Sequence, residues 1–228
     1  MFLENVWYVA AYSDEISAKG ALSRKLLGRS VIMYRTENGD PIAMLDRCPH
    51  RFVPLSEGFI SGGNVHCAYH GMVFAPDGRC IKIPGQGRIP DSARVATFPV
   101  VERHGFIWIW MGQADLADQT LIIDLPWHVD PNWTASSGYT HFSADYRLIS
   151  DNLLDLSHEN YIHERTIGNA ANESIAEFPP KVSYVDGAMV SVYREMPDIT
   201  PPPFFSLLRQ SDNRINRWQA AIWVARRP

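Results

Sequence analysis

Cysteine is scarce in this sequence of 228 residues, which contains only Cys48, Cys67 and Cys80. An odd and low count argues against a framework of disulfide bonds. It leaves metal ligation as the leading use for a pair of cysteines.

Long apolar runs are also absent. The longest one, Phe106 to Met111, has the length of a β-strand and falls far short of the ~20 residues that a membrane-spanning helix needs. The first residues, Met1 to Asn5, lack the basic region and apolar stretch of a secretory signal. We therefore expect a cytoplasmic protein with no membrane partner.

Basic residues are not in excess, because 21 lysines and arginines face 25 aspartates and glutamates, for a net charge of −4. Nucleic-acid binding usually needs a basic face, so we expect no nucleic-acid partner. The hydrophobic share of 46% and the charged share of 20% are ordinary for a globular protein. The length allows one large domain or two small ones, each with its own core.

The first half of the chain has a β pattern. Short apolar and β-branched runs alternate with turn signals such as Asn38-Gly39, Gly62-Gly63 and Asp77-Gly78. This predicts a small antiparallel, all-β domain over residues 1–112. The expected strands cover residues 30–34, 41–45, 95–101 and 106–110.

The second half mixes the two patterns. Residues 113–137 are richer in Asp, Pro and Ser and are interpreted as a linker. In residues 138–228 we expect strands at 138–145, 181–196 and 214–225 and a leucine-rich helix at 147–165. The overall prediction is an α+β chain, in which a helix packs on an antiparallel sheet after the β domain.

Two matched pairs of metal-ligand residues lie in the expected loops. They are Cys48-Pro49-His50 and Cys67-Ala68-Tyr69-His70, with 16 residues between them. Two cysteines and two histidines suit a Rieske [2Fe-2S] cluster, in which thiolates hold one iron and imidazoles hold the other. Pro49 stiffens the first loop, and Gly71 lets the backbone of the second loop turn closely around a cluster.

A structural zinc site remains the alternative for these four residues, because Cys₂His₂ sets also bind zinc. Zinc fingers generally group Cys with Cys and His with His, and this order differs. His66 precedes Cys67 along an extended segment, so its side chain is expected to point away. Cys80 is interpreted as a small buried apolar residue.

A second cluster of polar residues runs from Asp151 to His163. His158 and His163 are five residues apart, which on a regular helix separates them by about 140°. A π-bulge would bring both to one metal, and two imidazoles plus one carboxylate form the facial triad of non-haem Fe(II) oxygenases. Asp155, three residues before His158, is expected to accept a histidine N–H and orient that ligand. The alternative is a solvated amphipathic helix face.

These residues resemble a known family. The similarity is carried by five stretches, namely Asn5 to Ala11, Cys48 to Arg51, Cys67 to Gly71, Phe98 to Arg103 and Asp151 to His163. The chain resembles the oxygenase components of the Rieske non-haem iron oxygenases, and most of all their O-demethylase branch. The resemblance covers nearly the whole chain.

The resemblance implies two metal centres. A [2Fe-2S] cluster would be bound by Cys48, His50, Cys67 and His70, and a mononuclear Fe(II) by His158 and His163. Asn152 would line the iron site, and Asp155 would link His158 to His70 of a neighbouring subunit in a homotrimer.

It also implies a reaction and its partners. The family uses O₂ and electrons from a separate NAD(P)H-dependent reductase or ferredoxin to oxidise a small aromatic substrate. The O-demethylase branch points to a methoxylated aromatic acid. Two alternatives stay open, a ring-hydroxylating dioxygenase and an electron carrier of the Rieske ferredoxin type. Candidates for the substrate pocket are Leu153, Ile162, Ile167 and Gln219.

One departure from the family pattern concerns the third iron ligand, which is an Asp well over a hundred residues after the second histidine. This sequence stops before that distance, at Pro228. Asp186, Asp198 and Asp212 remain, but each has a turn-like context and none is assigned as a ligand. We therefore expect a C-terminally truncated oxygenase, or a fragment of a longer one, with weak iron binding at the histidine pair.

Overall fold

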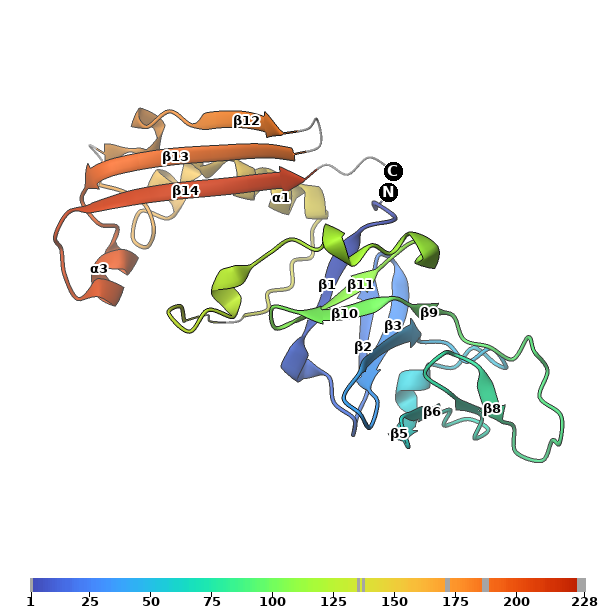
Figure 1. Ribbon diagram of the computed structural model, residues 1–228. Helices are drawn as coiled ribbons and strands as arrows, with labels where there is room; N and C mark the ends of the chain where they lie inside the picture. Colours follow the sequence, from blue (N-terminus) through green and yellow to red (C-terminus); the bar gives the residue numbers. More distant parts are fainter. Residues whose placement is uncertain (1, 135, 137, 171–172, 186–188, 225–228) are drawn as a thin grey trace. The chain divides into compact units, whose positions relative to one another are not determined.

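The computed structural model describes residues 2–134, 136, 138–170, 173–185 and 189–224. The chain divides into two compact units, residues 1–137 and 138–227 (Figure 1). The predicted α+β class, with a β domain followed by helices on an antiparallel sheet, is confirmed. In the described part of the chain, no helix combines the length and the apolar character that crossing a bilayer requires.

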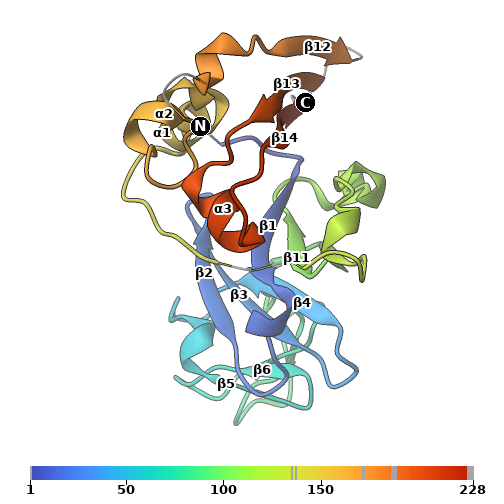
Figure 2. The same cartoon turned by 90° about the vertical axis from the view of Figure 1, so that its left-hand side faces the viewer.

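The first unit contains three antiparallel sheets (Figure 2). The first has the order β1 (Trp7–Tyr12), β11 (Phe106–Trp110), β10 (Val100–Arg103). The second has the order β2 (Leu22–Leu26), β3 (Arg29–Arg35), β4 (Pro41–Leu45), β9 (Thr97–Phe98). The third has the order β5 (Phe59–Ser61), β6 (Asn64–His66), β7 (Val73–Phe74), β8 (Cys80–Lys82).

Strand β3 is buried on both faces. Val31 and Met33 belong to one hydrophobic cluster with residues of β1 and β11. Ile32 and Tyr34 belong to a second cluster, which also contains Cys48 and Cys67. Because successive side chains of a strand point to opposite faces, an unbroken apolar run places this strand between two cores.

Pro99 divides the strand that was expected over residues 95–101. Phe98 in β9 pairs with Ala43 of β4, whereas Val100 in β10 pairs with Ile109 of β11. Proline has no N–H for a strand ladder, so the chain changes from one sheet to the other at this residue.

The segment interpreted as a linker, residues 113–137, contains short 3₁₀ turns at Ala114–Leu116, Gln119–Leu121 and Pro126–His128. It is tied to the β strands, because Trp7 Nε1 donates to the Asp118 carbonyl at 2.8 Å and Arg103 Nη2 lies 3.3 Å from Asp124 Oδ1. The exact domain boundary stays a prediction.

The second unit is a helical segment on a three-stranded antiparallel sheet (Figure 1). Its small core contains Ile175, Met196 and Ile199. The elements are α1 (Tyr146–Leu154), a 3₁₀ turn (Leu156–His158), α2 (Glu159–Ile162), a 3₁₀ turn (Ile175–Glu177), β12 (Lys181–Val185), β13 (Met189–Ile199), α3 (Pro203–Arg209) and β14 (Ile215–Val224).

Three expected elements of this unit were wrong. The residues described within 138–145 are exposed and form no strand. The single strand expected over 181–196 is a hairpin of β12 and β13. The helix expected over 147–165 is interrupted at Asp155, whose ψ of 92° is extended.

Candidate metal centres

The predicted cluster ligands lie in two loops, Cys48 to Val53 and Cys67 to Met72, which we call the ligand loops. The two loops share one pattern of backbone hydrogen bonds. In each loop the cysteine N–H donates to the carbonyl five residues later, and the cysteine carbonyl accepts from the N–H four residues later. The four bonds are Cys48 N to Val53 O (2.9 Å), Phe52 N to Cys48 O (2.9 Å), Cys67 N to Met72 O (2.8 Å) and Gly71 N to Cys67 O (3.0 Å). Two copies of one turn thus present a Cys and a His each.

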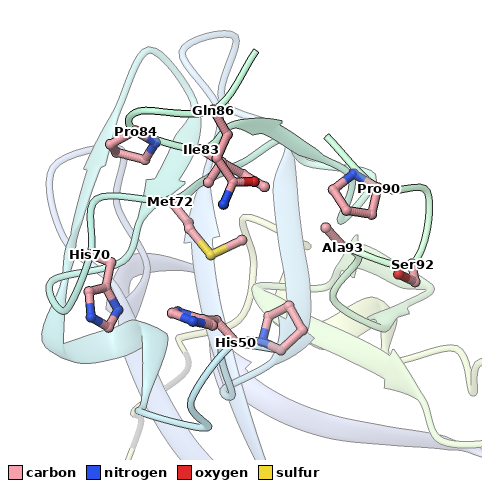
Figure 3. Close-up of a pocket in the computed structure, with 10 residues that line it drawn as sticks. His50, His70, Met72, Ile83, Pro84, Gln86, Pro90, Ser92 and Ala93 are labelled. Carbon is pink, nitrogen blue, oxygen red and sulfur yellow. The ribbon is translucent and has the colours of Figure 1, made fainter. Parts of the chain in front are cut away.

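The four predicted ligands differ in burial according to their residue type. Cys48 and Cys67 are buried, with 1% and 3% of their surfaces exposed. His50 and His70 are exposed, and their ring centroids are 4.7 Å apart (Figure 3). This arrangement fits a cluster in which the inner iron takes two thiolates and the outer iron takes two imidazoles.

The environment of Cys48 is unfavourable for a free thiolate. Burial raises the pKa of the Cys48 thiol, and the adjacent Cys67 thiol raises it further, while the N–H groups of His50 and Arg51 act in the opposite direction. A metal centre would supply the positive charge that keeps both cysteines deprotonated, because a coordinated thiol loses its proton.

The zinc alternative needs a different geometry. A structural zinc ion is surrounded by four ligands at one point. Here the two thiols are buried, whereas the two imidazoles are exposed. The pairwise separation of thiols and imidazoles therefore favours a two-metal cluster.

Asp46 anchors the first ligand loop at both ends, and sequence reasoning missed it. Its carboxylate is 6% exposed and accepts from Ser23 Oγ at 2.7 Å, Ser56 N at 2.8 Å and Ser56 Oγ at 2.6 Å. Asp46 precedes Cys48, and Ser56 follows the loop. The available signal was an Asp at the end of an apolar strand, next to the first cysteine.

A cavity of about 480 Å³ opens beside His50 and His70 (Figure 3). His50 and His70 form one side of it, and Met72 and Ile83 contribute apolar surface. The imidazoles therefore face an accessible hollow, whereas the cysteines face the core.

The second predicted site lies where the helix is interrupted. Asp155 leaves the helical conformation and its carboxylate accepts from Ser157 N at 3.0 Å, which begins the 3₁₀ turn. The Ser157 hydroxyl and N–H hold the pKa of Asp155 below its usual range. The expectation of a π-bulge was wrong, because a capped break performs that task.

The break brings His158 and His163 together. Their ring centroids are 5.4 Å apart, at an interplanar angle of 63°. His158 Nδ1 lies 2.5 Å from the Asp155 main-chain carbonyl, and its Nε2 lies 3.3 Å from Asn152 Nδ2. An Nδ1–H that donates to this carbonyl leaves the Nε2 lone pair available to a metal.

The contact of Asp155 with His158 is made by its main-chain carbonyl. The hydrogen bonds of its carboxylate, within the described residues, lead to Ser157. Its expected link to a histidine of another subunit stays a prediction.

A third iron ligand is not present in the described residues. Asp198 Oδ1 forms an ion pair with Arg214 Nε at 2.9 Å, Asp212 is exposed in a loop, and Asp186 lies outside the described residues. The residues present therefore fit two of the three protein positions of a facial triad.

The candidate pocket residues differ in their surroundings. Leu153 and Ile162 are exposed and Ile167 is half-buried. Gln219 instead donates to both carboxylate oxygens of Glu159, at 3.0 and 3.1 Å. Glu159 lies between the two histidines, and sequence reasoning did not identify it.

Comparison with known proteins agrees with both halves of this description. The Rieske [2Fe-2S] domain matches residues 6–99. The vanillate O-demethylase oxygenase C-terminal domain matches residues 142–227. The chain belongs to the Rieske oxygenase components. The resemblance found in the sequence is thereby confirmed.

Among relatives of this family, the vanillate O-demethylase oxygenase subunit of Pseudomonas sp. (strain HR199 / DSM 7063) is 40% identical over 96% of this chain and 62% of its own length. The dicamba O-demethylase oxygenase component of Stenotrophomonas maltophilia is 38% identical over 97% of this chain and 65% of its own length. The toluene-4-sulfonate monooxygenase iron-sulfur subunit TsaM1 of Comamonas testosteroni is 44% identical over 77% of this chain and 50% of its own length.

Solved structures of the family agree. Dicamba monooxygenase bound to 3,6-dichlorosalicylic acid matches with a TM-score of 0.90 and 37% identity, over 98% of this chain and 65% of that one. The same enzyme with non-haem iron and dicamba matches with a TM-score of 0.82 and 36% identity, over 98% of this chain and 63% of that one. This Rieske oxygenase chain thus spans between half and two thirds of the length of these relatives.

Proposed function

We propose that this chain is part of an oxygenase that uses O₂ and electrons from a separate reductase or ferredoxin to oxidise a small aromatic substrate. The observation that carries the proposal is the presence in one chain of two segregated Cys/His pairs and a convergent histidine pair. An electron carrier needs only the first, whereas oxygen chemistry also needs the second.

We propose O-demethylation of a methoxylated aromatic acid as the reaction. Relatives named for demethylating vanillate and dicamba support this choice. In such a reaction the methyl C–H bond is hydroxylated with one atom of O₂, and the hemiacetal then breaks down to a phenol and formaldehyde. The other oxygen atom leaves as water, with two electrons from the reductase and two protons.

Different residues of the chain would hold the two metal centres and orient their ligands. Cys48, His50, Cys67 and His70 would hold the [2Fe-2S] cluster. His158 and His163 would hold a mononuclear Fe(II), which supplies O₂ activation when bound. The Asp155 carbonyl fixes the orientation of His158, and the Asn152 amide lines the same site.

The arrangement of subunits is part of the proposal. The exposed His50 and His70 face outward, so electrons would leave the cluster towards another molecule. In a homotrimer, Asp155 would bridge His158 of its own subunit and His70 of the neighbouring subunit.

The decisive experiment is metal analysis of protein prepared anaerobically with abundant iron. We expect a visible absorption spectrum and two irons and two sulfides per chain from the cluster. Cys67→Ser should remove the colour, because it deletes an inner ligand. Cys80→Ser is the matched control, since Cys80 is also buried but lies outside the pairs, and a serine can keep its bond to the Lys82 carbonyl.

A colourless protein that binds zinc instead of iron would overturn the proposal. The reaction itself is tested by product analysis with methoxybenzoates and unsubstituted arenes. Formaldehyde and phenols support demethylation, whereas cis-diols would replace it with ring dioxygenation. In protein that is active in this assay, Asp155→Asn should keep the cluster spectrum and lose product formation; unchanged product would refute the bridge.

The carrier alternative has one observation in its favour, the lack of a third iron ligand in the described residues. Iron content separates the two possibilities for this chain alone. Two irons per chain indicate a loaded cluster only, and three indicate that the histidine pair is also occupied.

A further inference from the structure

A buried ion pair holds Glu159, the residue that follows His158 and precedes His163 in the sequence. Glu159, which follows His158 directly, is 5% exposed, and Arg217 of β14 is 9% exposed. Arg217 Nη2 and Glu159 Oε2 are 2.8 Å apart. Gln219, two residues further along β14, donates to the same carboxylate. Side chains of β14 therefore hydrogen-bond to Glu159, the first residue of the short helix α2.

The same guanidinium also holds the chain beyond His163. Arg217 Nη1 donates to the Ile167 carbonyl and to Asn169 Oδ1, both at 2.8 Å. Asn169 is itself buried. One arginine side chain thus fixes the segment before His163 and the segment after it.

The turn that follows His163 is packed tightly against α2. The His163 carbonyl accepts from the N–H groups of Thr166, Ile167 and Gly168, at 2.9–3.1 Å. A Cβ placed on Gly168 would lie 2.8 Å from the Glu159 carbonyl oxygen and 3.2 Å from the His163 carbonyl oxygen. The backbone of the two-histidine segment therefore has little freedom to shift relative to Glu159.

Stability alone does not account for a buried network of this kind. Removing two charges from water is costly, and well-packed apolar residues can often replace a buried pair without loss of stability. The distinctive property of this network is its position, because it joins both sides of the histidine pair to one strand. Mutation of residues that orient metal ligands without contacting the metal typically changes metal affinity 10–100-fold.

We propose that Glu159, Arg217 and Gln219 are positioning residues that set the separation and orientation of the His158 and His163 imidazoles. This inference rests on the proposed function, which assigns a metal to that histidine pair. None of the three residues needs to contact the metal.

The test uses Co(II) as a probe in the whole chain with its cluster oxidised, because an oxidised [2Fe-2S] cluster gives no EPR signal and high-spin Co(II) does. In wild-type protein we expect Co(II) binding that is lost in His158→Ala/His163→Ala. The double variant Glu159→Leu/Arg217→Met replaces the pair with apolar side chains. It should keep the circular dichroism spectrum and the unfolding midpoint, but bind Co(II) at least tenfold more weakly and with an altered EPR spectrum.

A milder variant covers the case in which that protein does not fold. Gln219→Ala removes one donor from a half-buried position and should weaken Co(II) binding about threefold without loss of fold. The matched control is Glu195→Gln, which breaks the exposed Lys181–Glu195 pair of the same sheet and should leave Co(II) binding unchanged.

The outcomes separate the two proposals. Folded variants that bind Co(II) with wild-type affinity and spectrum would overturn the positioning role and leave the proposed metal site intact. Wild-type protein whose Co(II) binding does not depend on His158 and His163 would overturn the site and the positioning role together.

Discussion

Phe52 and Gly71 occupy matching positions in the two ligand loops, and both adopt left-handed backbone conformations, with φ of 62° and 70°. Only glycine enters this region without a steric cost. At the first loop, a cation–π contact offsets the steric cost of the left-handed conformation. The Arg47 guanidinium lies 4.0 Å from the centre of the exposed Phe52 ring. At the second loop the chain uses glycine.

Substitutions at these two positions are predicted to have unequal effects. Gly71→Ala should lower the free energy of unfolding by about 1–2 kcal/mol, from left-handed strain, and its Cβ would also lie 3.2 Å from Pro84 Cγ. Phe52→Gly should be nearly neutral, because it relieves the same strain while losing the Arg47 contact. Urea unfolding followed by cluster absorption measures both, and an equal loss in the two variants would contradict the assigned strain.

Strand β3 links two sheets through the residue at its end. Arg35 Nη1 and Nη2 bind the two carboxylate oxygens of Glu102 in β10, at 2.7 and 2.9 Å. Its Nη2 also donates to the Ser13 carbonyl at 2.7 Å. The bond from Arg35 holds the pKa of Glu102 below its ordinary range. The pair therefore stabilises the fold only while Glu102 is ionised.

The pH dependence of this pair follows from that direction. A carboxylate with a lowered pKa stabilises the fold fully above its unfolded pKa of about 4.3, and loses the effect as pH falls through the lower folded value. Glu102→Gln should cost up to about 1 kcal/mol at pH 7, since the pair is partly exposed. The difference between variant and wild type should shrink below about pH 4.

Chemical denaturation at pH 7, 5 and 3 measures that difference. Glu37→Gln, at an exposed turn between β3 and β4, is the control and should show no such change. A constant difference across this pH range would show that the ion pair is not its source.

The break between α1 and α2 illustrates what an element-level pattern misses. The leucines at 148, 153, 154 and 156 indicated one helix correctly up to Leu154. The interruption depends on the Asp155 carboxylate accepting from Ser157 rather than on apolar periodicity. Asp and Ser compete with helical hydrogen bonds through their side chains, but also occur within helices, so sequence alone left this choice open.

At the scale of the whole molecule, the sequence predicted what is local and missed what is distant. The Cys/His pairs and the turns could be found because each is a short motif with its own chemistry. The switch of sheets at Pro99 and the Glu159–Arg217 pair, which joins residues 58 positions apart, depend on which segments meet in space. Residue types near either partner give no sign of that meeting.

The placement of the boundary between the two units can be tested with fragments. A fragment of residues 1–137 should fold and show cluster absorption, because it keeps the Trp7–Asp118 bond and the Arg103–Asp124 pair. A fragment of residues 1–112 loses both contacts and should unfold at lower urea concentration. Equal unfolding midpoints would support a domain that ends at residue 112 and a segment that contributes nothing to it.

The double burial of β3 also determines how the first unit opens. Amide protons of Val31 to Tyr34 should be the last to exchange with heavy water, since releasing them requires both hydrophobic clusters to separate at once. Local fraying cannot then detach the ligand loops from the rest of the unit. Loss of the cluster colour and loss of slow-exchanging amides should follow one cooperative transition.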